Sequence, residues 1–95
     1  MSLRFEWDPK KAAINLTKHG VSFEEALTVF SDPLARIFDD EDHSVEEGRE
    51  IIIGHSVKRR LLITCFTARQ TAIRLFSARL ATKRERQDYE ENVNS

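Results

Sequence analysis

The sequence has 95 residues, of which 40% are hydrophobic and 33% are charged, and its formal net charge is -1. This length and composition exclude a second domain and wholesale disorder, so we expect residues 1–95 to form a single domain. No apolar run reaches the roughly 18 residues of a membrane span, and the first residues lack a signal-peptide core. We therefore expect a cytoplasmic protein without a membrane partner. The single cysteine, Cys65, excludes an internal disulfide.

Charge is distributed unevenly along the chain. Residues 1–48 contain 5 Lys and Arg against 11 Asp and Glu, which leaves -6, whereas residues 49–95 contain 10 against 5, which leaves +5. A local basic surface attracts nucleic acid even when the net charge of the protein is negative. Mutual neutralisation of the two halves in the folded chain is the alternative explanation.

The first third of the chain is predicted to contain a strand and two helices. Residues 3–7 alternate apolar and polar side chains, a pattern typical of a short strand. Asp8 caps a helix with Pro9 in its first turn, and Gly20 suits the left-handed position that ends it. A capping box at residues 22–25 begins the second helix.

Four strands and a final helix are predicted after Pro33, which ends the second helix. The strands are residues 34–38, 49–55, 61–67 and 71–79, an acidic loop covers residues 39–48, and the final helix begins at Thr82. The last three strands are joined by short polar links, which favour antiparallel neighbours. The order β-α-α-β-β-β-β-α predicts an α+β domain with a mostly antiparallel sheet and helices packed on one face.

The junction between the last strand and the last helix carries cations where the helix dipole disfavours them. Thr82 and Glu85 form a capping box, yet Lys83 and Arg84 lie in the first turn, where each should cost about 0.3–1 kcal/mol. An anion between Arg79, Lys83 and Arg84 would reverse that cost. We therefore predict a phosphate site here; the alternative is that both cations extend into solvent.

Further arginines recur along the neighbouring strands. They are Arg59 and Arg60 at one hairpin end, Arg69 at the other, and Arg74 and Arg79 beyond. Guanidinium groups bind phosphate through paired N–H donors and stabilise negative charge in transition states. In residues 71–79 the side chains of Ile73, Leu75 and Ser77 alternate with Ala72, Arg74 and Phe76. One face is therefore expected to be apolar and the other to carry Arg74, unless the arginines are simply a solvated face.

Three residues are candidates for proton transfer by their chemistry: Lys18, His19 and His43. His19 also suits the helix C-terminus as a dipole partner. Tyr89 is either a packing residue of the last helix or a group that acts at the RNA or in proton transfer. Residues 39–43 combine carboxylates with an imidazole, but consecutive loop carboxylates are usually solvated and no HExxH or CxxC pattern supports a site. We therefore predict neither a metal nor a cofactor.

Several motifs together resemble the BrnT toxin family over residues 4–91. They are Phe5-Glu-Trp-Asp-Pro9, Asn15, Lys18-His-Gly-Val-Ser-Phe-Glu-Glu-Ala26, Asp42-His-Ser44, Ile53-Gly54, Ile73-Arg-Leu-Phe-Ser-Ala-Arg79, Glu85 and Tyr89. The resemblance implies a RelE-like fold, endoribonuclease activity that arrests growth, and neutralisation by a BrnA antitoxin that carries the DNA-binding part. Operator DNA is then contacted only through the antitoxin. The candidate positions it implies are Lys18, His19, Arg49, Arg60, Arg74, Arg79 and Tyr89.

The chain departs from the family pattern at two positions. Arg59 stands where the family usually has glycine, and Ala68 where it usually has glutamate, which removes one possible proton-transfer carboxylate. We hypothesise a metal-independent type II toxin in which the ribose 2′-OH attacks the adjacent phosphate of the RNA. The phosphate binders are Arg60, Arg74 and Arg79, the proton-transfer groups are Lys18, His19 and Tyr89, and the flanking RNA contacts are Arg49, Arg59, Arg69, Lys83 and Arg84. The alternative is a non-catalytic RNA- or protein-binding module that uses the same basic face.

Overall fold

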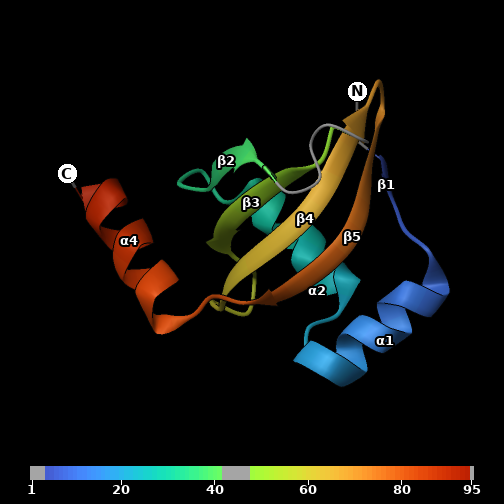
Figure 1. The fold of residues 1–95 in the computed structure, drawn as a ribbon, viewed down its shortest axis with the longest axis horizontal. Coiled ribbons are helices and arrows are strands. Elements are labelled where there is room, and N and C mark those ends of the chain that lie inside the picture. Colours follow the sequence, from blue (N-terminus) through green and yellow to red (C-terminus); the bar gives the residue numbers. More distant parts are fainter. Residues whose placement is uncertain (1–3, 42–47, 95) are drawn as a thin grey trace.

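The computed structural model describes residues 4–41 and 48–94, and His43 lies outside these residues. The elements follow the chain in the order shown in Figure 1. They are β1 (Arg4–Glu6), α1 (Pro9–His19), α2 (Phe23–Ala26), the 3-10 helix η1 (Leu27–Ser31), β2 (Arg36–Asp39), β3 (Glu50–His55), β4 (Leu61–Arg69), β5 (Ala72–Leu80) and α4 (Lys83–Asn94). The predicted α+β class and succession of elements are confirmed, with the second helix divided into α2 and η1.

Local capping determines where the first helices begin and end. The Asp8 carboxylate accepts the Lys10 N–H at 2.9 Å, and Gly20 ends α1 with a φ of +68°. Ser22 Oγ accepts the Glu25 N–H at 3.0 Å and thereby begins α2. The predicted caps are therefore confirmed. None of the helices in the described part of the chain is long and apolar enough to cross a membrane.

The five strands form one sheet in the order β1-β5-β4-β3-β2. The pairs β2–β3, β3–β4 and β4–β5 are antiparallel, and β1 pairs with β5 in parallel along only three residues. Beyond β1, the edge of β5 is completed by a side chain of α1. Buried Asn15 accepts the Ala78 N–H at 3.0 Å and donates to the Ala78 carbonyl at 2.8 Å, so its amide replaces a neighbouring strand.

The main core lies between the sheet and the first helices. Phe23, Ala26 and Val29 from α2 and η1 pack with sheet residues that include Leu62 and Leu75, all of them fully or almost fully buried. Trp7 meets Phe23 edge to face at a centroid distance of 5.7 Å. These contacts hold α1, α2 and η1 on one face of the sheet.

Helix α4 packs on the opposite face, in contrast to the prediction that all helices share one face. Its Tyr89 forms a second buried cluster with Ile53, Leu61 and Ile63. Ile53 and Ile63 alternate with the main-core residues of their strands and therefore face the other side. The strands carry apolar residues on both faces, so a helix is needed on each, and Figure 1 shows α4 set apart from α1 and α2.

Candidate nucleic-acid interface

A bulge in β5 places two of the predicted arginines on the same face. Phe76 is an extra residue, because its neighbours Leu75 and Ser77 pair with consecutive residues of β4. Regular alternation would put Arg74 and Arg79 on opposite faces, since an odd number of positions separates them. The bulge shifts the alternation by one residue, so both arginines lie on the α4 side. It also turns Ser77 to that side, which corrects the expectation that Ser77 shares the apolar face.

Part of this side of the sheet extends beyond α4, and we call it the open face. It is defined by Phe38, Arg49, Cys65, Arg74 and Phe76, each of them at least partly exposed. The guanidinium carbon of Arg49 lies 4.1 Å from the centroid of the Phe76 ring, a cation–π geometry. Cationic groups and accessible aromatic rings on one surface are the combination that binds single-stranded RNA through phosphates and stacked bases.

Arg79 faces the same side but is held by α4. Its Nη1 and Nη2 donate to Glu85 Oε1 and Oε2 at 2.8 and 2.9 Å. Glu85 also accepts the Thr82 N–H at 2.9 Å and Thr82 accepts the Glu85 N–H at 3.1 Å, which confirms the predicted capping box. Hydrogen bonding from Arg79 is the main reason that the pKa of Glu85 is lowered to about 2. A carboxylate of the chain itself thus meets Arg79 at this helix N-terminus, while Lys83 and Arg84 extend as exposed side chains.

Arg60 lies away from the open face, on the side of the sheet that α2 covers. Its Nε donates to Glu25 Oε2 at 2.9 Å, Nη2 also bonds Glu25, and Nη2 donates to the Gly20 carbonyl at 3.1 Å. The Glu25 side chain is only 2% exposed, and its pKa is lowered chiefly by the hydrogen bonds from Arg60. Arg60 therefore neutralises a buried carboxylate, a structural task that explains its place independently of RNA.

The predicted proton-transfer residues Lys18 and His19 lie at the end of α1, beside β5. Together with Phe76 and Ser77 they line a cavity of about 190 Å³ between α1 and the strand. Phe76 belongs to both this cavity and the open face, so the two surfaces adjoin. The ammonium group of Lys11, also on α1, lies 5.7 Å from the centroid of the Phe76 ring and adds positive charge at the same boundary.

Arg59 and Arg69 lie at opposite ends of β4. Arg59 lies in the turn before β4 with a φ of +63°, and Arg69 is the last residue of that strand. Both side chains are exposed. The register pairs Arg69 with Ala72 and so directs Arg69 to the same side of the sheet as Arg74, at the hairpin end, whereas Arg59 lies in the turn at the other end of β4.

Tyr89 anchors α4 to the sheet and to the segment before β2. Its hydroxyl lies 3.3 Å from the Leu34 carbonyl oxygen and 3.5 Å from the Asp32 carboxylate. Burial, and then the charge of Asp32, raise the pKa of Tyr89. The ring also meets the His55 imidazole at a centroid distance of 5.6 Å. These contacts agree with the packing interpretation of Tyr89.

The sequence did not predict His55 as a site residue. In the structure it forms a polar cluster with Asp32. Asp32 accepts the His55 backbone N–H at 2.8 Å, and its Oδ2 lies 3.8 Å from His55 Nδ1. Burial opposes ionisation of Asp32, but the backbone N–H groups of His55 and Leu34 lower its pKa nevertheless. His55 ends an apolar run, so no local signal in the sequence distinguishes it from an ordinary strand residue.

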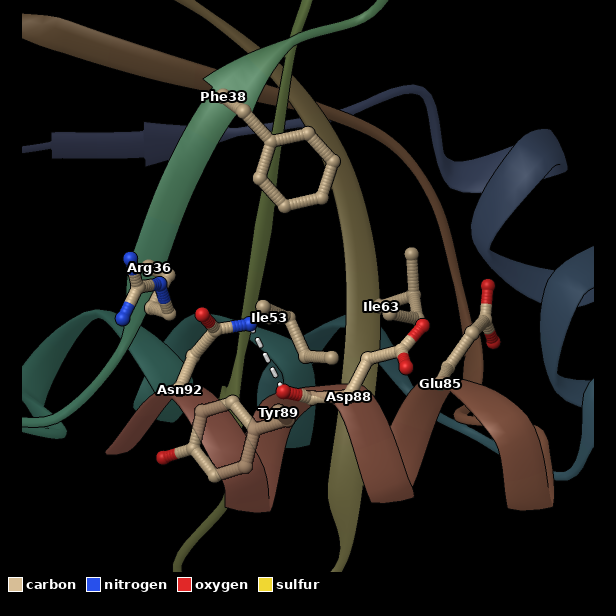
Figure 2. Close-up of a pocket in the computed structure, with 8 residues that line it drawn as sticks. All are labelled: Arg36, Phe38, Ile53, Ile63, Glu85, Asp88, Tyr89 and Asn92. Atoms are coloured by element: carbon tan, nitrogen blue, oxygen red, sulfur yellow. Dashed lines mark hydrogen bonds between the residues drawn. The ribbon is translucent and has the colours of Figure 1, made fainter. Parts of the chain in front are cut away.

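A cavity of about 250 Å³ lies between α4 and the sheet, as Figure 2 shows. Ile53 and Ile63 form its apolar floor. The ring of Phe38 lies across the cavity from α4, which contributes the side chains of Asp88 and Asn92. Because Phe38 also belongs to the open face, the cavity borders that surface. Sequence patterns did not predict this cavity, because they did not place α4 on this side of the sheet.

The predicted site residues lie in several separate parts of the structure. Those on the α4 side of the sheet are Arg49, Arg69, Arg74 and Arg79; those beside β5 are Lys18 and His19; those on α4 itself are Lys83, Arg84 and Tyr89; and those before β4 are Arg59 and Arg60. Within residues 4–41 and 48–94 no group of three or more His, Cys, Asp or Glu side chains is placed to hold a metal ion.

Residues 7–85 match the family model described as the ribonuclease toxin BrnT of type II toxin-antitoxin systems. Among solved structures, the fold is similar to the crystal structure of the Brucella abortus ribonuclease toxin BrnT, with a TM-score of 0.68 and 22% sequence identity. That similarity covers 86% of this chain and 100% of the Brucella chain, and at this identity it shows the fold alone. No curated protein matches the sequence.

Proposed function

The chain belongs to the BrnT family of ribonuclease toxins from type II toxin-antitoxin systems, and from this premise we propose that it is an endoribonuclease that cleaves RNA on the open face. The observation that carries the proposal is the β5 bulge, which directs Arg74 and Arg79 to the face where Arg49 stacks on Phe76. Bulges frequently re-aim side chains beside active sites. The arrangement supplies cations for phosphates and aromatic rings for bases.

The proposed reaction needs no metal ion. The ribose 2′-OH attacks the adjacent phosphorus, the bond to the 5′-oxygen of the next nucleotide breaks, and a 2′,3′-cyclic phosphate remains. Arg74 and Arg49 bind the phosphate and stabilise the charge that develops on its oxygens. Arg79 lies under α4 in its ion pair with Glu85 and acts at the margin of this site.

Proton transfer is assigned to the α1 end beside β5. His19 has the chemistry of a general base or acid near neutral pH, and Lys18 adds a second donor. Both line the cavity that adjoins the open face through Phe76. We do not assign proton transfer to Tyr89, because its hydroxyl is engaged with Leu34 and Asp32 and its raised pKa disfavours loss of the proton.

A type II system pairs its toxin with a protein antitoxin, so the family implies such a partner as well as an RNA substrate. We propose a BrnA-type antitoxin whose own DNA-binding domain contacts the operator. In that arrangement the toxin touches DNA only through its partner. Co-expression of the adjacent reading frame should restore growth to cells that express this chain.

Incubation of the purified protein with single-stranded RNA in excess chelator tests the proposed activity. We expect internal cleavage products with 2′,3′-cyclic phosphate ends, identified by their sensitivity to a cyclic phosphodiesterase. Salt-sensitive RNA binding without cleavage would contradict the enzyme and favour the non-catalytic binding module, which predicts binding alone. Cleavage that chelator abolishes would contradict the metal-independent reaction.

A further inference from the structure

We infer that the cavity between α4 and the sheet binds one unstacked base of the RNA and favours guanine. This inference rests on the proposed ribonuclease function and names the part of the substrate that this cavity holds. At about 250 Å³ the cavity is slightly below the range typical of sites for drug-sized ligands, and it suits one small flat group.

The sheet register places the cavity beside Arg79, at the margin of the proposed phosphate site. Arg36 pairs with Ile53, Ile53 with Ile63, and Ile63 with Arg79, so the apolar floor lies between two arginines in one row across four strands. Neighbouring strands are about 4.8 Å apart, which makes this row short enough for one or two nucleotides to span. An RNA backbone on the open face thus passes the mouth of the cavity.

The walls of the cavity match the way proteins hold unstacked RNA bases. Phe38 is 50% exposed, which is high for a large aromatic side chain, and Figure 2 shows its ring facing the α4 side chains across the cavity. Arg36 lies at one end of the same space. Aromatic rings and guanidinium planes are the surfaces on which single-stranded bases stack.

The polar groups of the cavity favour a base over an apolar side chain of a protein partner. Asp88 and Glu85 both line it, and Glu85 is already engaged by Arg79 and Thr82. Exposed Asp88 presents a carboxylate that only accepts hydrogen bonds when it is ionised. The Watson–Crick edge of guanine carries two adjacent donors, N1–H and the N2 amino group, which suit one carboxylate. An apolar side chain offers no donor to the Asp88 carboxylate.

Binding of uncleavable RNA separates this inference from catalysis. The probes are 2′-O-methyl heptanucleotides of uridine with guanosine or uridine at the centre, and fluorescence anisotropy gives the Kd of each. We expect the wild-type protein to prefer the guanosine probe. Phe38→Ala should weaken its binding on the order of tenfold, because a stacking surface is lost. Ile37→Ala is the matched control, since Ile37 is 54% exposed on the same strand but points to the opposite face.

A second pair of variants tests base recognition. Asp88→Asn should abolish the preference for guanosine while uridine binding stays the same, whereas Glu90→Gln, two positions further along α4, should keep the preference. A wild-type protein without preference, or a Phe38→Ala variant that binds like wild type, overturns the inference. A Phe38→Ala variant that binds RNA normally but binds the antitoxin more weakly also overturns it. Guanosine-selective binding without RNA cleavage would support the cavity and contradict the proposed ribonuclease.

Discussion

At the scale of single residues, two arginines that were predicted from the sequence to bind phosphate form ion pairs with carboxylates of the chain itself. Arg60 bonds buried Glu25, and Arg79 bonds Glu85 at the start of α4. The sequence around each arginine does not indicate which carboxylate it contacts. Residue chemistry identified these arginines as anion binders, but only the fold identifies the anion that each one meets.

The ion pair at α4 makes stability depend on pH in the acid range. The folded-state pKa of Glu85 is about 2, below its ordinary value of 4.5, so the stabilisation is complete above about pH 4.5 and is lost as the pH falls toward 2. Glu85→Gln should therefore lower the free energy of unfolding by about 1–2 kcal/mol at pH 7, after solvent screening of this partly exposed pair. Urea unfolding at pH 7 and at pH 3 measures the difference, which should shrink at the lower pH. An equal difference at both values would contradict the contribution of this ion pair.

Arg59 carries backbone strain in the turn before β4. Its φ of +63° lies in the left-handed region, which costs an ordinary residue about 1–2 kcal/mol. Arg59→Gly removes this strain and thereby stabilises the folded state. Because glycine loses more entropy on folding, the net increase in the free energy of unfolding should be only about 1 kcal/mol. Lys58→Gly, in the same turn but outside the residues with positive φ, is the control and should not stabilise the protein. Stabilisation of both variants alike would show that strain at Arg59 is not the cause.

At the scale of elements, the features that depend on neighbouring residues could be predicted from the sequence. The Asp8 cap, the Gly20 terminus and the Thr82–Glu85 capping box all arise within a few positions and are confirmed. The bulge at Phe76 could not be predicted, because it results from pairing with β4 and not from the composition of β5. Alternation alone therefore assigned Ser77 to the wrong face and left the common side of Arg74 and Arg79 unnoticed.

The sequence pattern also could not predict which face of the sheet α4 covers. Tyr89 identifies the buried side of the helix, but its partners Ile53 and Ile63 lie on strands whose apolar residues point to both faces. The sequence thus shows that α4 packs on the sheet without showing which face it covers. The cavity beneath α4 and the proposed base site both depend on this choice of face.

At the scale of the whole molecule, the uneven charge of the two halves has two consequences. Glu25 from the acidic half neutralises Arg60 from the basic half, so some of the opposite charges of the two halves pair with each other in the folded chain. Arg49 and Arg74, also from the basic half, lie on the open face. The two explanations considered for the charge pattern therefore apply to different residues of one chain.

The claim that the open face cleaves RNA is tested most directly by the rate of cleavage in chelator for Arg74→Ala, with Arg59→Ala as the control. Both residues are arginines, but Arg59 is exposed in the turn before β4, at the end of that strand away from the β4–β5 hairpin and outside the open face. Loss of a phosphate-stabilising donor should reduce kcat/KM on the order of 10²–10³ for Arg74→Ala, whereas Arg59→Ala should stay near wild type. Equal rates for Arg74→Ala and the wild-type protein would contradict the assignment of the catalytic surface.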